Sequence, residues 1–294
     1  MKKFAINEEF LQQVETLQTI LRNNIAGMFG GNRKSKSFGS SSEFADYRDY
    51  EPGDDVARID WNAYARFDKL YLKLYLDERQ MHTRIYIDAS RSMDYGAEKK
   101  AEQAVKVAAC LAYLSIAEME KVSIYTVRDN IVSEVVPPIV GKDAYYASIG
   151  RLNDIVFDGD SRISDAILPS NVGYGDGMSV IISDFLTDND YESAIDHLVG
   201  KKRDVLCVQI LSKDEMNPQI RGKSHLFDAE NAEKSYKKNI DRDIAAAYRR
   251  ALEYVIARIR DYCRARGASY LLAPAEEPIA DLFFAKLVDM EVLK

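Results

Sequence analysis

The chain has 294 residues, of which 47% are hydrophobic and 30% are charged, as in an ordinary globular protein. Its formal net charge of −7 argues against a dedicated nucleic-acid-binding protein, which normally carries a basic excess or a basic face. The length allows one large domain or two small ones. The short basic cluster GNRKSKS at 31–37 is interpreted as a solvated loop in preference to a phosphate-binding arm.

Cysteine usage and hydropathy predict a soluble cytoplasmic protein with no membrane insertion. Cys110, Cys207 and Cys263 are far apart and form no CxxC pair, so we expect reduced, packed thiols instead of a zinc site or a disulfide framework. The charged N-terminus is not followed by the apolar segment of a signal peptide. The most apolar helical run, Val107–Ala117, has 11 residues, whereas a membrane span needs about 20.

The first third of the chain is predicted to hold one helix, one loop and two strands. Residues 7–28 place apolar side chains at helical spacing and predict an amphipathic helix. The Gly-, Ser- and Lys-rich segment that follows predicts a loop. The alternating segment Tyr71–Arg79 predicts a half-exposed strand, and Arg84–Asp88 predicts a second strand.

The rest of the chain alternates strands with helices. Helices are expected at 97–120, 143–152, 191–200, 241–267 and 279–290, and strands at 121–127, 131–137, 178–185, 204–211 and 268–274. Because the strands are almost wholly apolar, this order predicts a mostly parallel sheet with helices on both faces. In such sheets the functional site lies at the carboxyl ends of the strands.

Oxygen-bearing side chains follow two of the predicted strands. RIYIDASRSM places Asp88, Ser90 and Ser92 at alternate positions, and MSVIISDF ends with Asp184. These hard oxygen donors suit Mg²⁺ or Mn²⁺ better than zinc or copper. In an extended loop the three side chains at alternate positions would point the same way. A second loop should add a hydroxyl, and one position would stay open for a carboxylate from outside, because two aspartates leave a divalent ion near neutral.

Other interpretations of this segment stay open. A phosphoryl-accepting aspartate usually has a second aspartate two residues later, where this chain has Ser90, and the chain contains no GxSxG, Walker A or HExxH motif. A Ser-His-Asp triad is not excluded, although His82, His197 and His225 lie in unrelated contexts. Asp and Ser after a strand also cap helices, and the motif alone favours that role. Its position at a strand end, together with Asp184, favours the metal site.

These residues resemble the metal-ion-dependent adhesion site (MIDAS) of von Willebrand factor A domains. Asp88, Ser90 and Ser92 match the DxSxS motif, and Asp184 matches the later aspartate. Ser161, in DGDSRISDAI, aligns with a loop residue that is normally threonine, and a serine keeps the hydroxyl. Phe185 stands where glycine often follows the later aspartate. The resemblance implies that Mg²⁺ (or Mn²⁺) is held by Asp88, Ser90, Ser92, Ser161 and Asp184.

A longer motif resembles the bacterial family called domain of unknown function 58. Its pattern, close to E-F-x-x-x-R-x-Y-x-x-G-D-D-x-R-x-I-D-W-x-x-x-A-R, is matched within residues 42–66, with Ala57 as an extra residue before Arg58. The likeness covers about residue 30 to the C-terminus. It implies that the chain acts with a MoxR-type AAA+ ATPase as an adaptor in the assembly or activation of client proteins.

The same motif has a purely structural interpretation. We expect its charged side chains to form a buried salt-bridge network, with Trp61 as a core anchor, in preference to contacting a partner directly, because buried charges must be paired. The network would contain Asp54, Asp55, Arg58, Asp60 and Arg66. The arginine-rich helix at 241–267 also carries acidic residues and is interpreted as a solvated face.

The sequence therefore predicts a three-layer, Rossmann-like α/β fold of the von Willebrand factor A type. Residues 81–294 would form this domain, with an insertion at about 212–240, and residues 1–80 an extension of helix, loop and strand. The predicted function is non-enzymatic: a metal-dependent module that binds an acidic side chain of a protein partner, a MoxR-type ATPase or its client. The alternatives are a metal-dependent phosphatase or hydrolase that uses Asp88 and Asp184, and a metal-free structural domain.

Overall fold

The largest element of the fold is a six-stranded sheet with strand order β10–β7–β6–β3–β4–β5. The computed structural model describes residues 6–24, 44–75, 81–94, 100–175, 177–219, 222–227 and 235–283. The five strands from β10 to β4 are parallel, and only β5 runs antiparallel, paired with β4. This arrangement confirms the predicted, mostly parallel sheet. The strands are β3 (His82–Asp88), β4 (Lys121–Arg128), β5 (Ile131–Ile139), β6 (Met178–Ser183), β7 (Asp204–Leu211) and β10 (Ser269–Pro274).

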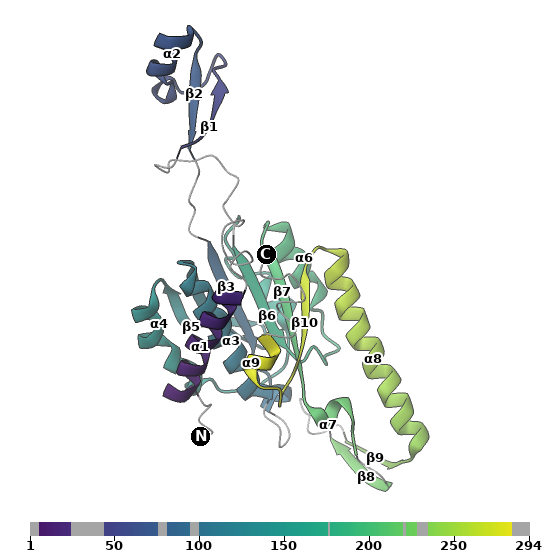
Figure 1. The fold of residues 1–294 in the computed structure, drawn as a ribbon. Coiled ribbons are helices and arrows are strands. Elements are labelled where there is room, and N and C mark those ends of the chain that lie inside the picture. The colour runs from purple at the N-terminus through teal and green to yellow at the C-terminus, as the bar shows by residue number, and fades with distance from the viewer. Residues whose placement is uncertain are drawn as a thin grey trace.

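Helices cover both faces of this sheet, which confirms the three-layer architecture (Figure 1). Consecutive strand residues point to opposite faces, so Ile85 and Ile87 join one buried cluster and Tyr86 joins the other. The first cluster includes residues of α1 (Glu8–Asn24), α3 (Lys100–Ala117), α4 (Lys142–Ser148), the 3-10 helix η3 (Ile149–Asp154) and α9 (Ile279–Leu282). The second includes residues of α5 (Ile163–Ile167), α6 (Glu192–Gly200) and α8 (Arg242–Ala265).

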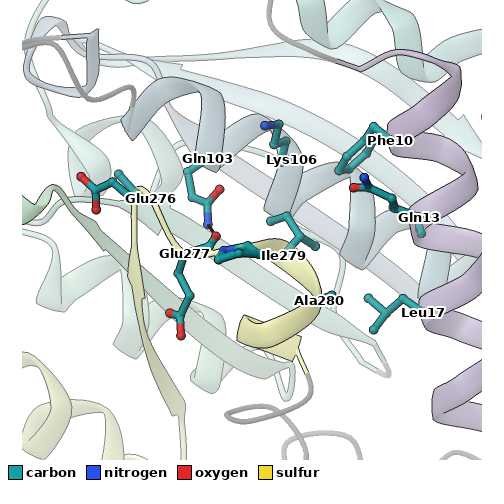
Figure 2. Close-up of a pocket in the computed structure, with 12 residues that line it drawn as sticks. Phe10, Gln13, Leu17, Gln103, Lys106, Glu276, Glu277, Ile279 and Ala280 are labelled. Carbon is teal, nitrogen blue, oxygen red and sulfur yellow. Dashed lines mark hydrogen bonds between the residues drawn. The ribbon is translucent and has the colours of Figure 1, made fainter.

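The amphipathic helix predicted near the N-terminus is α1, and it packs against the sheet domain. Its apolar face buries Phe10, Val14 and Leu17 in the same cluster as α3. A pocket of about 340 Å³ lies between α1, α3 and the segment that leads into α9. Figure 2 shows Gln103 pointing toward Glu277 in this pocket, where its amide donates to the Glu277 carbonyl at 2.8 Å. The polar wall of the pocket is therefore used to hold α9 in place.

A small unit formed by residues 44–75 precedes the sheet domain in the chain. Strands β1 (Phe44–Asp49) and β2 (Tyr71–Tyr75) pair antiparallel, and the 3-10 helix η1 (Val56–Arg58) and helix α2 (Trp61–Phe67) lie between them in the chain. Figure 1 shows α2 beside the two strands. Asp60 caps α2, because its carboxylate accepts from the backbone N–H groups of Asn62 and Ala63. The strand predicted at 71–79 corresponds to β2, whereas β1 and α2 were not predicted.

The expectation of a buried network anchored by Trp61 in this unit is wrong. Trp61 is 61% exposed, whereas Ala63 is the buried residue of the short helix α2. Arg58 and Asp55 lie 3.8 Å apart on the surface, where such pairs contribute little to stability. Asp60 is the one member of the predicted network that is buried, at 5% exposure.

The segment between β7 and α8 contains a short helix and a hairpin. Helix α7 (Lys213–Met216) follows β7, and strands β8 (Gly222–Phe227) and β9 (Ser235–Ile240) pair antiparallel. The sequence had indicated an insertion in this region without resolving its elements.

The remaining expectations have mixed outcomes. All three cysteines are free and buried, as predicted. On α8, Arg258 and Arg266 pair with Glu192 and Asp196 at the surface, in agreement with a solvated face. The basic cluster at 31–37 lies outside the described residues. Within the described ranges, no helix combines the length and the apolar character that crossing a membrane requires.

Candidate metal centre at the carboxyl ends of the strands

The candidate site begins at Asp88, the last residue of β3, whose side chain is buried at 1% exposure. The chain stays bound to the neighbouring strand just beyond it, because the Ala89 N–H donates to the Val127 carbonyl at 2.8 Å. The Asp88 carboxylate then accepts from the Ser90 N–H at 3.0 Å. This local turn directs Asp88 inward at the edge where the parallel strands end.

The two serines of the motif lie together, but the chain that carries them is not extended. Ser90 and Ser92 place their hydroxyl oxygens 3.1 Å apart. The expected straight alternation is wrong, since residues Arg91–Asp94 form a turn of 3-10 helix, named η2. The tight turn brings the hydroxyls together by winding the backbone, and it buries Ser92 against the strand ends.

Ser161 reaches the site from the loop before α5. Backbone bonds fix this loop to the DxSxS segment: the Asp158 N–H donates to Ala89, and the Arg91 N–H donates to Gly159. Gly159 has a φ of +87°, and a Cβ there would lie 2.8 Å from an Asp129 oxygen, so the close approach requires glycine. The Ser161 hydroxyl donates to the Asp88 carboxylate at 2.6 Å. The structure therefore brings Ser161 to Asp88.

The last residue of strand β6, Ser183, and the residue after it, Asp184, also contribute side chains. The Ser183 hydroxyl donates to the same Asp88 oxygen as Ser161, at 2.6 Å, and accepts from the Phe185 N–H. Asp184, which is also buried, accepts from the Leu186 N–H at 3.0 Å through one carboxylate oxygen. All five predicted side chains thus lie at this edge of the sheet, and Ser183 joins them.

Phe185, which follows Asp184, adopts a left-handed backbone conformation. Its φ of +52° lies in the left-handed region, where glycine is favoured and other residues are strained. The ring is buried and makes an edge contact with Tyr191 at a centroid distance of 5.4 Å. Burial of the ring offsets the strain of this backbone conformation.

A lysine from α3 is buried at the site, which the sequence did not predict. Lys100 is 2% exposed, and its ammonium lies 2.7 Å from an Asp184 oxygen and 2.6 Å from a Glu215 oxygen. Burial acts to lower the pKa of Lys100, but the attraction of Asp184 and Glu215 outweighs it and raises the pKa above its usual value. Lys100 is therefore charged, and it neutralises Asp184.

Asp88, by contrast, has neutral partners. In the described part of the chain its carboxylate accepts from one backbone N–H and from the hydroxyls of Ser161 and Ser183. Burial raises the pKa of Asp88, the nearby Asp184 charge raises it further, and the hydroxyl hydrogen bonds act against this rise. The site thus holds a buried carboxyl group that has no cationic partner among the described residues, so its ionised form is disfavoured without an added cation.

This donor set fits a hard divalent cation. Two carboxylates and three hydroxyls supply oxygen ligands of the kind that Mg²⁺ and Mn²⁺ prefer. Within the described ranges, no group of three or more His, Cys, Asp or Glu side chains is arranged to hold a metal. A metal at Asp88 would therefore depend on the serine hydroxyls, with Asp88, Ser90, Ser92, Ser161 and Asp184 as its ligands. When bound, the ion would supply a positive charge at the site and could coordinate an oxygen ligand from another molecule.

Three residues near the site were not predicted from the sequence, and they differ in how much the sequence pattern around them indicates a role. Ser183 stands beside Asp184 and could have been included. Glu215 is marked by the capping-box pattern Ser212-x-x-Glu215, which the structure forms. Lys100 gave no signal, because a lysine in the charged first turn of a helix is normally solvated.

Comparisons with known proteins identify mycobacterial relatives of this chain. The chain is 25% identical over 226 residues to the uncharacterized protein Mb1516 of Mycobacterium bovis, covering 74% of this chain and 70% of that protein. The uncharacterized protein Rv1480 of Mycobacterium tuberculosis matches with the same identity and coverage.

Two solved structures show a weaker likeness. An aerotolerance-related membrane protein from Bacteroides fragilis gives a TM-score of 0.42 at 15% identity, covering 72% of this chain and 98% of that chain. The VWA domain of SpRpn10 gives a TM-score of 0.41 at 11% identity, covering 71% of this chain and 96% of that chain. Neither likeness bears on the function of this chain.

The family model described as "Protein of unknown function DUF58" matches residues 46–257, which include most of the unit at 44–75, the DxSxS segment and most of the central sheet. The match spans well over half of the 294 residues. The chain therefore belongs to the DUF58 family.

Proposed function

We propose that this protein is a non-enzymatic, divalent-metal-dependent protein-binding module, with Mg²⁺ or Mn²⁺ held at the five clustered oxygen side chains. The observation that carries the proposal is the buried Asp88 carboxylate, which lacks a cationic partner in the described residues while a second carboxylate, Asp184, raises its pKa. An uncompensated buried charge is costly, and a bound cation removes that cost.

The charges around the site support an acidic ligand. With Asp88 ionised, Asp88, Asp184, Glu215 and Lys100 would together carry a net charge of −2, from three carboxylates and one ammonium. A single divalent ion would make this set neutral. A carboxylate from a partner would then meet the ion without net repulsion from the protein. We therefore propose that the partner presents an Asp or Glu side chain.

Access to the site requires a movement of the surrounding chain. Ser92 is the most exposed of the five side chains, at only 9%. Since Ser92 lies on the short helix η2, we propose that an outward shift of η2 opens a route to the ion. The proposal thus includes a closed form, described here, and a more open form that accepts the partner.

The identity of the partner is proposed from the family resemblance. It implies a cytoplasmic adaptor that binds a MoxR-type AAA+ ATPase or one of its clients. The site chemistry supports the acidic contact, and the pairing with an ATPase rests on the resemblance alone.

The first test is a titration with Mn²⁺ followed by electron paramagnetic resonance, which counts free and bound ions directly. Wild type should bind one ion, and Asp88→Asn, which keeps the size of the side chain, should bind none. Asp196→Asn is the matched control, because Asp196 is an exposed aspartate on α6 that pairs with Arg266 outside the site. Absence of binding to wild type overturns the proposal.

The second test compares stability and partner capture. Mg²⁺ at 100 times its dissociation constant should stabilise wild type by about 2.7 kcal/mol, or about 5–10 °C in melting temperature. A candidate ATPase should be retained in Mg²⁺ and lost in EDTA or with Asp88→Asn. Turnover of a phosphoester that Asp88→Asn abolishes would instead establish the hydrolase alternative.

A metal-free structural domain is the second candidate, and Lys100 favours it. The ammonium of Lys100 already neutralises Asp184, so this carboxylate needs no metal ion to balance its charge. This candidate predicts that no divalent ion binds and that EDTA leaves the melting temperature of wild type unchanged.

A further inference from the structure

We propose that Lys100 competes with the metal for Asp184. The Lys100 ammonium binds Asp184 when the metal is absent, and Glu215 alone holds it when the metal is present. This inference rests on the proposed metal site and assigns its regulation to a residue outside the DxSxS motif. The ammonium contacts both carboxylates at once, at 2.7 Å and 2.6 Å, so it does not need to cross the site to change partner.

Competition follows from the positions of the charges. One Asp184 oxygen accepts from Leu186, and the other accepts from Lys100. A divalent ion on this carboxylate would lie within a few ångströms of the ammonium, in a buried region where like charges repel strongly. The metal must therefore displace Lys100 from Asp184 or bind less tightly, and in either case the lysine lowers the affinity for the metal.

Glu215 gives the displaced ammonium a fixed position. One carboxylate oxygen of Glu215 accepts from the Ser212 N–H at 2.8 Å and from its hydroxyl at 3.0 Å, as part of the capping box of α7. The other oxygen is the one that Lys100 contacts. Because the capping box holds this carboxylate in place, Lys100 can leave Asp184 without becoming an unpaired buried charge.

The test compares the Mn²⁺ affinity of wild type, Lys100→Met, Glu215→Gln and the double variant, again by electron paramagnetic resonance. Lys100→Met should bind Mn²⁺ about tenfold more tightly or more, the size of one charged hydrogen bond. Glu215→Gln should bind about tenfold more weakly, since Lys100 is then held by Asp184 alone. In the double variant the effect of Glu215→Gln should vanish, because Glu215 acts through Lys100.

Matched controls separate this competition from a change in net charge. Lys106→Met removes a positive charge from the same helix, where Lys106 pairs with Glu102 and not with the site. Its Mn²⁺ affinity should stay within about twofold of wild type. Glu102→Gln is the corresponding control for Glu215→Gln. If Lys100→Met does not fold, the contrast between Glu215→Gln and Glu102→Gln decides the question.

The outcomes distinguish the two proposals. Tighter binding by Lys100→Met than by a wild type that itself binds Mn²⁺ supports the inference. Binding by Lys100→Met alone overturns the proposed metal-dependent function and, with it, the regulatory role of Lys100. Binding by wild type with equal or weaker binding by Lys100→Met overturns the inference and leaves the metal site intact. If neither binds Mn²⁺, the metal site and the competition are both overturned.

Discussion

Asp60 in the unit at 44–75 and Asp88 in the sheet domain are both buried aspartates with several hydrogen bonds, yet their pKa values move in opposite directions. The hydroxyl of Tyr47 lowers the pKa of Asp60 most, and the cap N–H groups and Lys73 add to this, so that it reaches about 2. Burial raises the pKa of Asp88, and the Asp184 charge adds to the rise. Counting hydrogen bonds would not separate the two residues.

The difference lies in how each charge is balanced. Lys73 lies 3.3 Å from Asp60, so the chain supplies its own cation and the aspartate stabilises the fold. Asp88 has neutral donors and a like-charged neighbour, so its ionised form destabilises the fold unless a cation arrives. A buried charge balanced by its own chain indicates a structural role, and one left unbalanced indicates a site for a ligand.

Among variants of the site, the largest effect on stability should come from breaking the ion pair between Lys100 and Asp184. Asp184→Ala keeps Glu215 as a carboxylate partner of Lys100, but it removes one charged hydrogen bond of the ammonium and the acceptor of the Leu186 N–H. We therefore expect a loss of about 2–3 kcal/mol in the free energy of unfolding, measured with urea. Asp158→Ala, at an exposed pair, should change the urea midpoint little. A wild-type midpoint for Asp184→Ala would mean that Glu215 alone suffices to neutralise Lys100.

A smaller effect of opposite sign is expected at Asp88. In EDTA, Asp88→Asn removes an unbalanced buried charge but keeps hydrogen-bonding capacity, and it should stabilise the protein by about 1–2 kcal/mol. In saturating Mg²⁺ the order should reverse, because wild type alone gains the bound ion. Thermal unfolding in both buffers measures the reversal. Destabilisation of Asp88→Asn in EDTA would contradict the contrast with Asp60.

Acid should test the balanced aspartate of the small unit. Because the folded pKa of Asp60 is about 2 and its usual value is 3.8, its contribution to stability is present above 3.8 and is lost as the pH falls through about 2. Trp61 is the one tryptophan of the chain and follows Asp60 directly, so its fluorescence reports on this unit. Asp60→Asn should remove this acid transition.

The smallest effect is expected at Trp61 itself. Trp61→Ser should change the free energy of unfolding by no more than about 0.5 kcal/mol, since the side chain is 61% exposed. Leu72, which is buried in the same unit, provides the contrast: Leu72→Ala should cost about 2–5 kcal/mol. A large loss for Trp61→Ser would restore its role as a core anchor.

The central sheet was predictable because its strands are continuous apolar runs between helical patterns, and a parallel sheet needs such runs when both faces are covered. The unit at 44–75 was less predictable, since its short elements bury few residues and periodicity carries little information there. The positions of Asp88, Ser90, Ser92, Ser161 and Asp184 were predictable from strand ends and from resemblance to a known motif.

The charge balance of the site was not predictable. Lys100 is separated from Asp184 by 84 residues, and its burial depends on how α3 packs at the strand ends. The pattern of residues along α3 could not distinguish this lysine from a solvated one. The 3-10 turn at Arg91–Asp94 was likewise missed, because an alternating pattern of serines is compatible with several backbone shapes.

The outer strand β5 carries Pro137 and Pro138 in succession, at a place where its pairing with β4 is already irregular. Proline has no N–H to offer, so a further strand cannot add continuously along this side of the sheet. The opposite outer strand, β10, ends in Pro274. These prolines therefore disfavour edge-to-edge pairing between the sheets of two copies. They also disfavour the addition of an extended peptide as a further strand beside β5. Recognition by backbone pairing is disfavoured there, which leaves side-chain contacts as the means by which a partner would be selected.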